Sequence, residues 1–195
     1  ARLIAAYCAG QLDESMIKYK GKYVAFVQYT QDNPIKHGLN VCSCNCLYTT
    51  VLLSFLVYAG KEYTPKEDRA AARMCDQLIN IAGLTNARGR VLTTESWYTS
   101  IALATLLFEE YSWTLVGTVN STDKALREKL DIPFHKLTRG ARESVHRGWY
   151  REAVIEMKTK HGKTYYIQCT TWRDKKQVCF LSSNRTGSSA GKNLI

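Results

Sequence analysis

Two long apolar segments, separated by only four residues, constrain the fold more than any other feature of this chain. They run from Leu39 to Cys46 and from Val51 to Tyr58. Each has the length of a β-strand, and the nearly continuous apolar character is typical of strands that are covered on both faces. The sequence therefore predicts a central sheet with helices packed against it.

The rest of the first two thirds of the chain alternates between strand and helix patterns. Alternating β-branched and aromatic residues predict strands at Tyr23–Tyr29, Arg90–Thr94 and Trp113–Val119. Helices are predicted at Thr64–Gly83, Trp97–Glu110 and Ser121–Leu130. The first of these helices has the clearest start, because Thr64 can cap it, Pro65 suits the first turn and Glu67 completes a capping box.

The last third of the chain is predicted to be a β-meander. Gly148–Met157, Thr164–Thr171 and Gln177–Ser182 alternate as strands, with a turn at residues 160–163 between the first two. The whole pattern predicts an α/β fold, a mixed sheet flanked by helices and followed by a small β-meander. The expected divisions are a helical lead and link at 1–22, a core at 23–135, a β-rich insertion-like meander at 136–184 and a flexible tail at 185–195.

The charge balance favours a polyanionic partner. The net charge is +10, from 27 basic and 17 acidic residues, and such a balance attracts DNA or RNA, with a solvated basic surface or an acidic protein partner as the alternatives. Trp149 is the best candidate for aromatic contact with a partner, whereas Trp97, Trp113 and Trp172 are expected in the core. The predicted nucleic-acid-binding residues are Arg139, Arg142, Arg147, Trp149, Arg151, Lys158, Lys160 and Lys163.

The cysteine content indicates an intracellular protein. Seven cysteines, an odd number, with several in apolar runs, favour reduced buried thiols over a disulfide framework. Cys42, Cys44 and Cys46 share one face at strand period, so a zinc site is conceivable, but zinc prefers four ligands and core packing is favoured. No metal site is therefore predicted. No apolar run reaches the roughly 20 residues that a membrane span needs.

Several motifs, in the same order, resemble the catalytic domain of piggyBac-type transposases. The resemblance covers about residues 11 to 184 and implies an RNase H-like fold, action on DNA and a nuclear location, with an organelle as the alternative. The segments that carry it are Leu12–Lys22 (LDESMIKYKGK), Lys36–Lys61 (KHGLNVCSCNCLYTTVLLSFLVYAGK), Thr94–Ile101 (TESWYTSI), Trp113–Val119 (WTLVGTV) and Cys169–Ser183 (CTTWRDKKQVCFLSS).

The resemblance also implies where metal-binding carboxylates would lie. It places the first family Asp at Cys46 and the second at Glu95, and no residue of this chain matches the third. A thiol is a poor magnesium ligand, and the extra methylene of Glu95 shifts its oxygens in a geometry-sensitive site. Cys46 and Glu95 are therefore expected to be degenerate positions, at which the family's metal-binding Asp has been replaced, and no catalytic residue is expected to be intact. No cofactor is expected, except magnesium if residual activity persists. Asp13 and Glu14 are expected to have structural roles.

These inferences predict a catalytically inactive, domesticated piggyBac transposase-like module that acts in DNA binding or in protein assembly. One alternative is a structural subunit of a large intracellular complex, with or without nucleic acid. The other is a fragment of an active DNA transposase. In each case a protein partner is expected to cover apolar strands that the incomplete sheet exposes.

Overall fold

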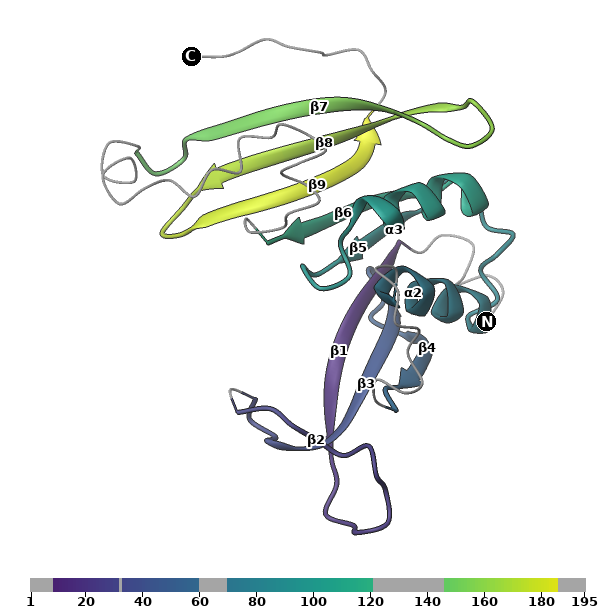
Figure 1. The fold of residues 1–195 in the computed structure, drawn as a ribbon, viewed down its shortest axis with the longest axis vertical. Helices are drawn as coiled ribbons and strands as arrows, with labels where there is room; N and C mark the ends of the chain where they lie inside the picture. The colour runs from purple at the N-terminus through teal and green to yellow at the C-terminus, as the bar shows by residue number, and fades with distance from the viewer. Residues whose placement is uncertain (1–8, 32, 60–69, 121–145, 186–195) are drawn as a thin grey trace.

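A single mixed sheet organises the protein (Figure 1). The computed structural model describes residues 9–31, 33–59, 70–120 and 146–185. Within these residues the strand order is β2-β3-β1-β5-β6-β9-β8-β7, and β4 pairs with β3 beside this path. The predicted mixed sheet is confirmed. The strands are β1 (Gly10–Lys18), β2 (Gln28–Tyr29), β3 (His37–Cys46), β4 (Leu52–Val57), β5 (Val91–Thr94), β6 (Thr114–Val119), β7 (Tyr150–Lys158), β8 (Thr164–Arg173) and β9 (Gln177–Arg185).

Few helices accompany the sheet. They are α2 (Ala70–Ile81), α3 (Ile101–Leu106) and the π-helical turn η1 (Leu107–Tyr111), which continues α3. Ser100 caps α3, since its hydroxyl accepts a hydrogen bond from the Leu103 amide at 3.1 Å. The predicted cap at Thr64 and the predicted helix Ser121–Leu130 lie outside the described residues. No helix in the described part of the chain is long and apolar enough to cross a membrane.

The expectation of a helical lead is wrong for residues 10–18, because they form the central strand β1. This strand pairs antiparallel with β3 over its whole length, from Gly10 opposite Cys46 to Lys18 opposite Gly38. On its other edge it pairs parallel with β5, with Gly10 beside Leu92. Tertiary pairing on both edges therefore overrides a weak local preference. The strand predicted at Tyr23–Tyr29 is also much shorter, since only β2 forms there.

The C-terminal meander is confirmed as three strands, but it extends the core sheet rather than standing apart. β9 pairs antiparallel with β6, and Val116 lies opposite Ser182. β8 and β7 then follow as antiparallel neighbours. Figure 1 shows these long strands lying alongside β6, with the β7–β8 turn near α3. β9 reaches Arg185, one residue into the predicted tail, and the rest of that tail lies outside the described residues.

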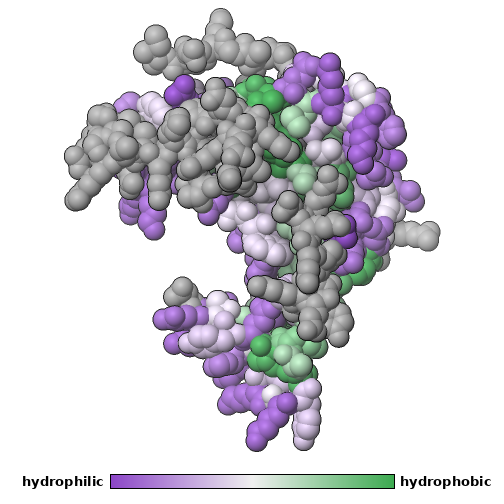
Figure 2. Space-filling model, in the orientation of Figure 1, coloured by the Kyte–Doolittle hydropathy of each residue, from purple (hydrophilic) through white to green (hydrophobic). Residues whose placement is uncertain are grey.

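The core contacts one face of β4 and leaves the other open. Ser54 is buried and its hydroxyl donates to the Leu78 carbonyl oxygen at 2.7 Å, which ties β4 to α2. By contrast, the side chains of Leu52, Phe55 and Val57 are exposed, Phe55 to 55%. The expectation that both faces of this strand are covered is therefore wrong. The face seen in Figure 2 is mostly hydrophilic, with small, separate hydrophobic patches.

Most of the described cysteines are reduced. Cys42, Cys44, Cys75, Cys169 and Cys179 are free and buried, as expected. Cys46 is disulfide-bonded, so the expectation of reduced thiols is wrong at this position. Burial raises the pKa of the Cys44 thiol to about 11 and that of Cys169 to about 12. These buried thiols are therefore protonated at neutral pH and act as small apolar core groups.

We expect the free energy of unfolding to fall as the pH rises from 9.0 towards about 11, because the Cys44 thiol ionises first in the unfolded chain. Its contribution is fully present below pH 9.0 and is lost by about 1.4 kcal/mol per pH unit across this window. Urea unfolding of the wild type and of Cys44→Ala from about pH 8 to about pH 11 measures the effect. The variant should show a shallower fall, and equal slopes would contradict the prediction.

Candidate functional site

The sheet topology brings two acidic segments to one place. β1 and β5 are parallel, with Gly10 beside Leu92 and Gln11 beside Thr93. Continued by two residues, this register brings Asp13 level with Glu95, which follows the last residue of β5. In open α/β sheets, ligands bind beyond the carboxyl ends of the strands. The chain therefore has a candidate site between the middle of β1 and the end of β5.

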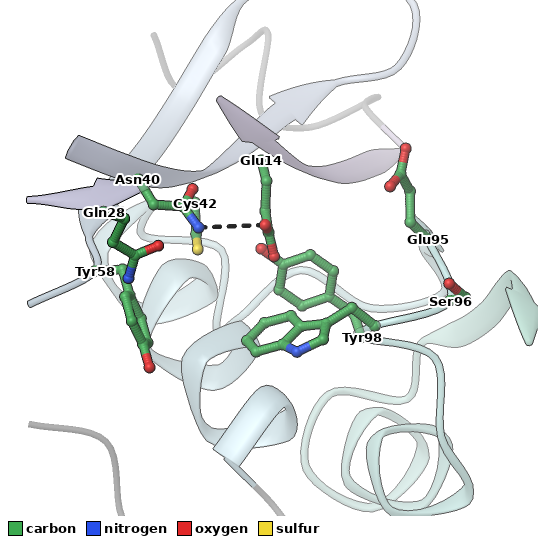
Figure 3. A pocket seen from close by; sticks show the side chains of 9 residues that line it. Glu14, Gln28, Asn40, Cys42, Tyr58, Glu95, Ser96 and Tyr98 are labelled. Atoms are coloured by element: carbon green, nitrogen blue, oxygen red, sulfur yellow. Dashed lines mark hydrogen bonds between the residues drawn. The ribbon is translucent and has the colours of Figure 1, made fainter. Parts of the chain in front are cut away.

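A pocket of about 360 Å³ lies at this position (Figure 3). Glu14 and Tyr98 point into it, and Glu95 stands at its edge. Its lining combines acidic, amide, hydroxyl and aromatic side chains on β1, β2, β3, the end of β4 and the turn after β5. The lining residues are Glu14, Gln28, Asn40, Cys42, Tyr58, Glu95, Ser96, Trp97 and Tyr98.

Strand alternation decides which of the two adjacent acids faces the pocket. Leu12 and Glu14 lie on the same face of β1, whereas Asp13 lies on the other. The Asn40 amide donates to the Glu14 carboxylate at 3.3 Å. The Asp13 carboxylate instead accepts from the backbone N–H of Glu14 at 2.8 Å. Glu14 is therefore the acid of β1 that is available to a ligand in the pocket.

A short turn holds Glu95 and Trp97 at the surface. The Thr99 hydroxyl donates to the Glu95 carbonyl oxygen at 2.8 Å and lies 2.7 Å from the Thr94 hydroxyl. The backbone N–H groups of Tyr98 and Thr99 donate to the same carbonyl at 3.1 and 3.0 Å. The predicted helix at Trp97 therefore begins later, at Ile101, and the residues before it form a fixed turn that carries pocket side chains.

Tyr98 and Cys42 make the inner part of the pocket neutral. Tyr98 is 1% exposed, and its hydroxyl makes no hydrogen bond of good geometry to any described residue. Burial, then the nearby Cys42 thiol and then Glu14, raise the pKa of Tyr98 far above its usual range. Burial also raises the pKa of Cys42. Neither group can serve as an ionised nucleophile at neutral pH.

The structure does not bring Cys46 and Glu95 together. Cys46 lies opposite Gly10, at the start of β1, because β3 runs antiparallel to β1. Glu95 follows β5, which runs parallel to β1. Because Gly10 lies beside Leu92, Glu95 lies three residues further along the sheet than the level of Cys46 and Gly10. Cys46 is also buried, disulfide-bonded and absent from the pocket lining. The carboxylate that accompanies Glu95 in the pocket is Glu14, on the strand that sequence patterns assigned to a helical lead.

The predicted basic surface is divided between two ends of one strand. Arg147, Trp149 and Arg151 lie at or before the start of β7, and the three lysines lie at its end and in the following turn. Arg151 and Lys158 are seven residues apart along β7, a span of about 23 Å for a strand. Arg147 pairs with Asp174 at 2.5 Å, whereas Lys158, Lys160 and Lys163 are exposed. Arg139 and Arg142 lie outside the described residues.

The division of the tryptophans into buried and exposed residues differs from the prediction. Trp113 is fully buried, as expected. Trp97 and Trp172 are 51% and 39% exposed, so the expectation of core positions is wrong for both. Trp149 is half-buried. Trp97 is the tryptophan that lines the pocket, and it lies in the turn between β5 and α3.

The described residues of this pocket supply only some of the ligands that a divalent cation needs. Glu14 and Glu95 offer carboxylate oxygens and Asn40 offers an amide oxygen, and these are ligand types that suit magnesium. However, no three His, Cys, Asp or Glu side chains of the described segments converge well enough to hold a metal ion. Water or substrate phosphate oxygens would have to supply the remaining ligands.

Comparisons with known proteins agree with this architecture. A family model described as Transposase IS4 matches residues 8–193. A solved structure, the piggyBac transposase synaptic complex with hairpin DNA, is similar to this chain with a TM-score of 0.68 and 22% sequence identity. The match covers 95% of this chain and 35% of that one. No curated protein matches the sequence.

Proposed function

The chain belongs to the Transposase IS4 family, in agreement with its resemblance to piggyBac-type transposases, and we propose that it binds DNA without cutting it. The observation that carries this proposal is the pocket between β1 and β5, which has the carboxylates of Glu14 and Glu95 but no third carboxylate among the described lining residues. A transposase-like fold whose described residues offer two carboxylates at this pocket supports DNA binding without cleavage. Action on DNA would place the protein in the nucleus.

The chemistry of strand cleavage makes this incompleteness important. Divalent ions in such sites stabilise negative charge on a phosphate during in-line attack. Here Glu14, Glu95 and Asn40 would hold such an ion. The Glu14 side chain is already engaged by the Asn40 amide at 3.3 Å. Because small misplacements of ligands reduce rate strongly, a pocket with Glu14 pointing into it and Glu95 at its edge supports weak cation binding rather than efficient cleavage.

The charge of the chain supports the DNA-binding part of the proposal. A net charge of +10 favours association with a polyanion. The exposed lysines at the β7–β8 turn, Lys158, Lys160 and Lys163, lie next to η1, where the backbone N–H of Lys160 donates to the Glu109 carboxylate at 2.9 Å. The solved relative was captured in a complex with hairpin DNA. DNA is accordingly the polyanion that we propose for this surface.

We expect replacement of Lys158, Lys160 and Lys163 by Ala to weaken duplex DNA binding about tenfold and to reduce the dependence of affinity on salt. The reason is that fewer phosphate contacts release fewer counterions. Fluorescence anisotropy with labelled duplex DNA at several salt concentrations measures both quantities. The control replaces three exposed lysines on the other side of the molecule, Lys18, Lys20 and Lys22, by Ala. An equal loss in both triple variants would contradict a DNA surface at the β7–β8 turn.

Cleavage is tested separately with magnesium or manganese and supercoiled or hairpin DNA. The proposal expects no metal-dependent nicking by the wild type. Robust nicking that disappears in Glu95→Ala would overturn the inactive assignment. That result would favour part of an active transposase, an alternative that fits the 35% coverage of the larger relative.

A role in protein assembly is the second candidate, and the open face of β4 favours it. Leu52, Phe55 and Val57 expose apolar surface on a strand that pairs with β3 alone among the described residues. Contiguous exposed apolar side chains often mark a protein interface. Sedimentation of the wild type and of Phe55→Ser would test this function. A monomeric wild type that binds DNA normally would speak against it.

A further inference from the structure

We propose that the pocket beside Glu14, Trp97 and Tyr98 binds a single unpaired nucleobase. This inference rests on the proposed function and adds to it the part of the DNA that the pocket receives. Three observations point to a small, flat and uncharged ligand. They are a buried hydroxyl whose polar neighbour among the described residues is the weakly bonding Cys42 thiol, an exposed aromatic side chain in the lining, and acidic side chains with no basic residue beside them in the described lining.

The buried hydroxyl is the first observation. Tyr98 is 1% exposed and lines the pocket, and its hydroxyl makes no hydrogen bond of good geometry to any described residue. Buried polar groups in proteins nearly always have a partner. The neighbouring Cys42 thiol is only a weak one. The hydroxyl can therefore donate to, or accept from, a polar edge of a ligand that enters the pocket.

Trp97 is the second observation. It is 51% exposed although its indole is held in place, since its ring meets the Tyr98 ring edge-to-face at a centroid distance of 4.6 Å and an angle of 87°. The hydrogen bonds around Glu95 also fix the turn that carries it. A positioned aromatic ring with free area is a stacking platform for a base.

The charge of the pocket is the third observation, and it selects a base over a phosphate. Among the described residues, the acidic side chains in the lining are Glu14 and Glu95, and no described Lys, Arg or His lines it. A phosphate would be repelled, whereas carboxylates accept hydrogen bonds from exocyclic amines such as cytosine N4. Asn40 and Gln28 add amide groups that can donate to base oxygens and nitrogens.

A base within a duplex cannot enter such a pocket, because it is stacked and paired. Extrusion costs least when the base is mismatched, bulged or single-stranded. The proposal therefore concerns DNA with an unpaired base. It predicts tighter binding of such DNA than of fully paired DNA, whereas a general affinity for phosphates predicts equal binding of the two. The volume of about 360 Å³ lies in the range of small-ligand pockets.

The test compares a duplex that carries one bulged 2-aminopurine or cytosine with the same duplex fully paired. We expect about tenfold tighter binding of the bulged duplex, and quenching of 2-aminopurine fluorescence as it stacks. Tyr98→Phe, which removes only the hydroxyl, and Trp97→Ala should each bring the affinity ratio close to one. Trp172→Ala, at a similarly exposed tryptophan on β8, is the matched control and should keep the wild-type ratio.

The outcomes separate this inference from the proposed function. Normal binding of paired DNA with a wild-type ratio near one would overturn the pocket assignment alone, whereas no binding of any duplex would overturn the proposed function. A bulged thymine, which lacks an exocyclic amine, should bind more weakly than a bulged cytosine. A gain in affinity that needs magnesium and is equal for paired and bulged DNA would assign the pocket to a cation and refute the base.

Discussion

Trp113→Ala should lower the free energy of unfolding by about 3–5 kcal/mol, the range for large-to-small changes at buried aromatic residues. Trp113 is fully buried and directly precedes β6. Its ring packs near Tyr111 at a centroid distance of 5.7 Å, and its indole N–H donates to the Ala87 carbonyl oxygen. The substitution therefore leaves a cavity and also an unsatisfied carbonyl.

Urea unfolding followed by circular dichroism measures this effect. Trp172→Ala serves as control, because that tryptophan is 39% exposed and its loss should cost only about 0.5 kcal/mol. Trp113→Phe should fall between the two, since it keeps most of the apolar volume but not the hydrogen bond to Ala87. A loss below about 1 kcal/mol for Trp113→Ala would show that this tryptophan does not anchor the core.

Strands with strong local patterns could be predicted from the sequence. β3 and β6 carry apolar or β-branched residues at strand period, and the β7–β8 hairpin has its turn where Gly162 takes a positive φ of 75°. These features depend on neighbours in sequence. The mixed sheet and the order along the chain of the strands after β1 followed from them, and the family resemblance added the expectation of an RNase H-like fold.

β1 could not be predicted in the same way, and this error moved the site. Asp13, Glu14 and Ser15 are poor strand formers, and the segment is a strand because β3 and β5 hydrogen-bond to its two edges. Those pairings connect residues far apart in sequence. The family resemblance placed a site residue at Cys46 of β3, and the helical expectation for β1 left Glu14 out of consideration. With β1 in the sheet, Glu14 is the residue that shares a pocket with Glu95.

The exposure of individual side chains could not be predicted from the sequence either. Trp97 and Trp113 occur in similar sequence surroundings, near the boundary of a strand or helix, yet one is exposed and the other is buried. The difference depends on the turn that Thr99 fixes through the Glu95 carbonyl. Likewise, Arg151 and Lys158 are close in sequence but lie at opposite ends of β7. Sequence spacing alone does not show which side chains share a surface.

Gly117→Ala should cost about 3 kcal/mol, at the upper end for added volume in a packed interior. Gly117 lies in β6 directly beside Thr94 of β5. A Cβ atom there would be 2.2 Å from the Thr99 hydroxyl oxygen, 2.6 Å from the Thr94 hydroxyl oxygen and 2.7 Å from the Thr94 carbonyl oxygen. Backbone and short side chains surround it, so the structure can relieve the overlap only by moving β5 or the turn.

That turn carries Glu95 and Trp97, so the same substitution should also disturb the pocket. Gly10→Ala is the matched control, because a Cβ atom at Gly10 would meet the tip of the Leu92 side chain at 2.9 Å, which can rotate away. Urea unfolding compares the stabilities, and the affinity ratio for bulged over paired DNA reports on the pocket at temperatures where Gly117→Ala remains folded. A fully stable Gly117→Ala with the wild-type ratio would mean that the contact between Gly117 and the two threonines does not position the turn.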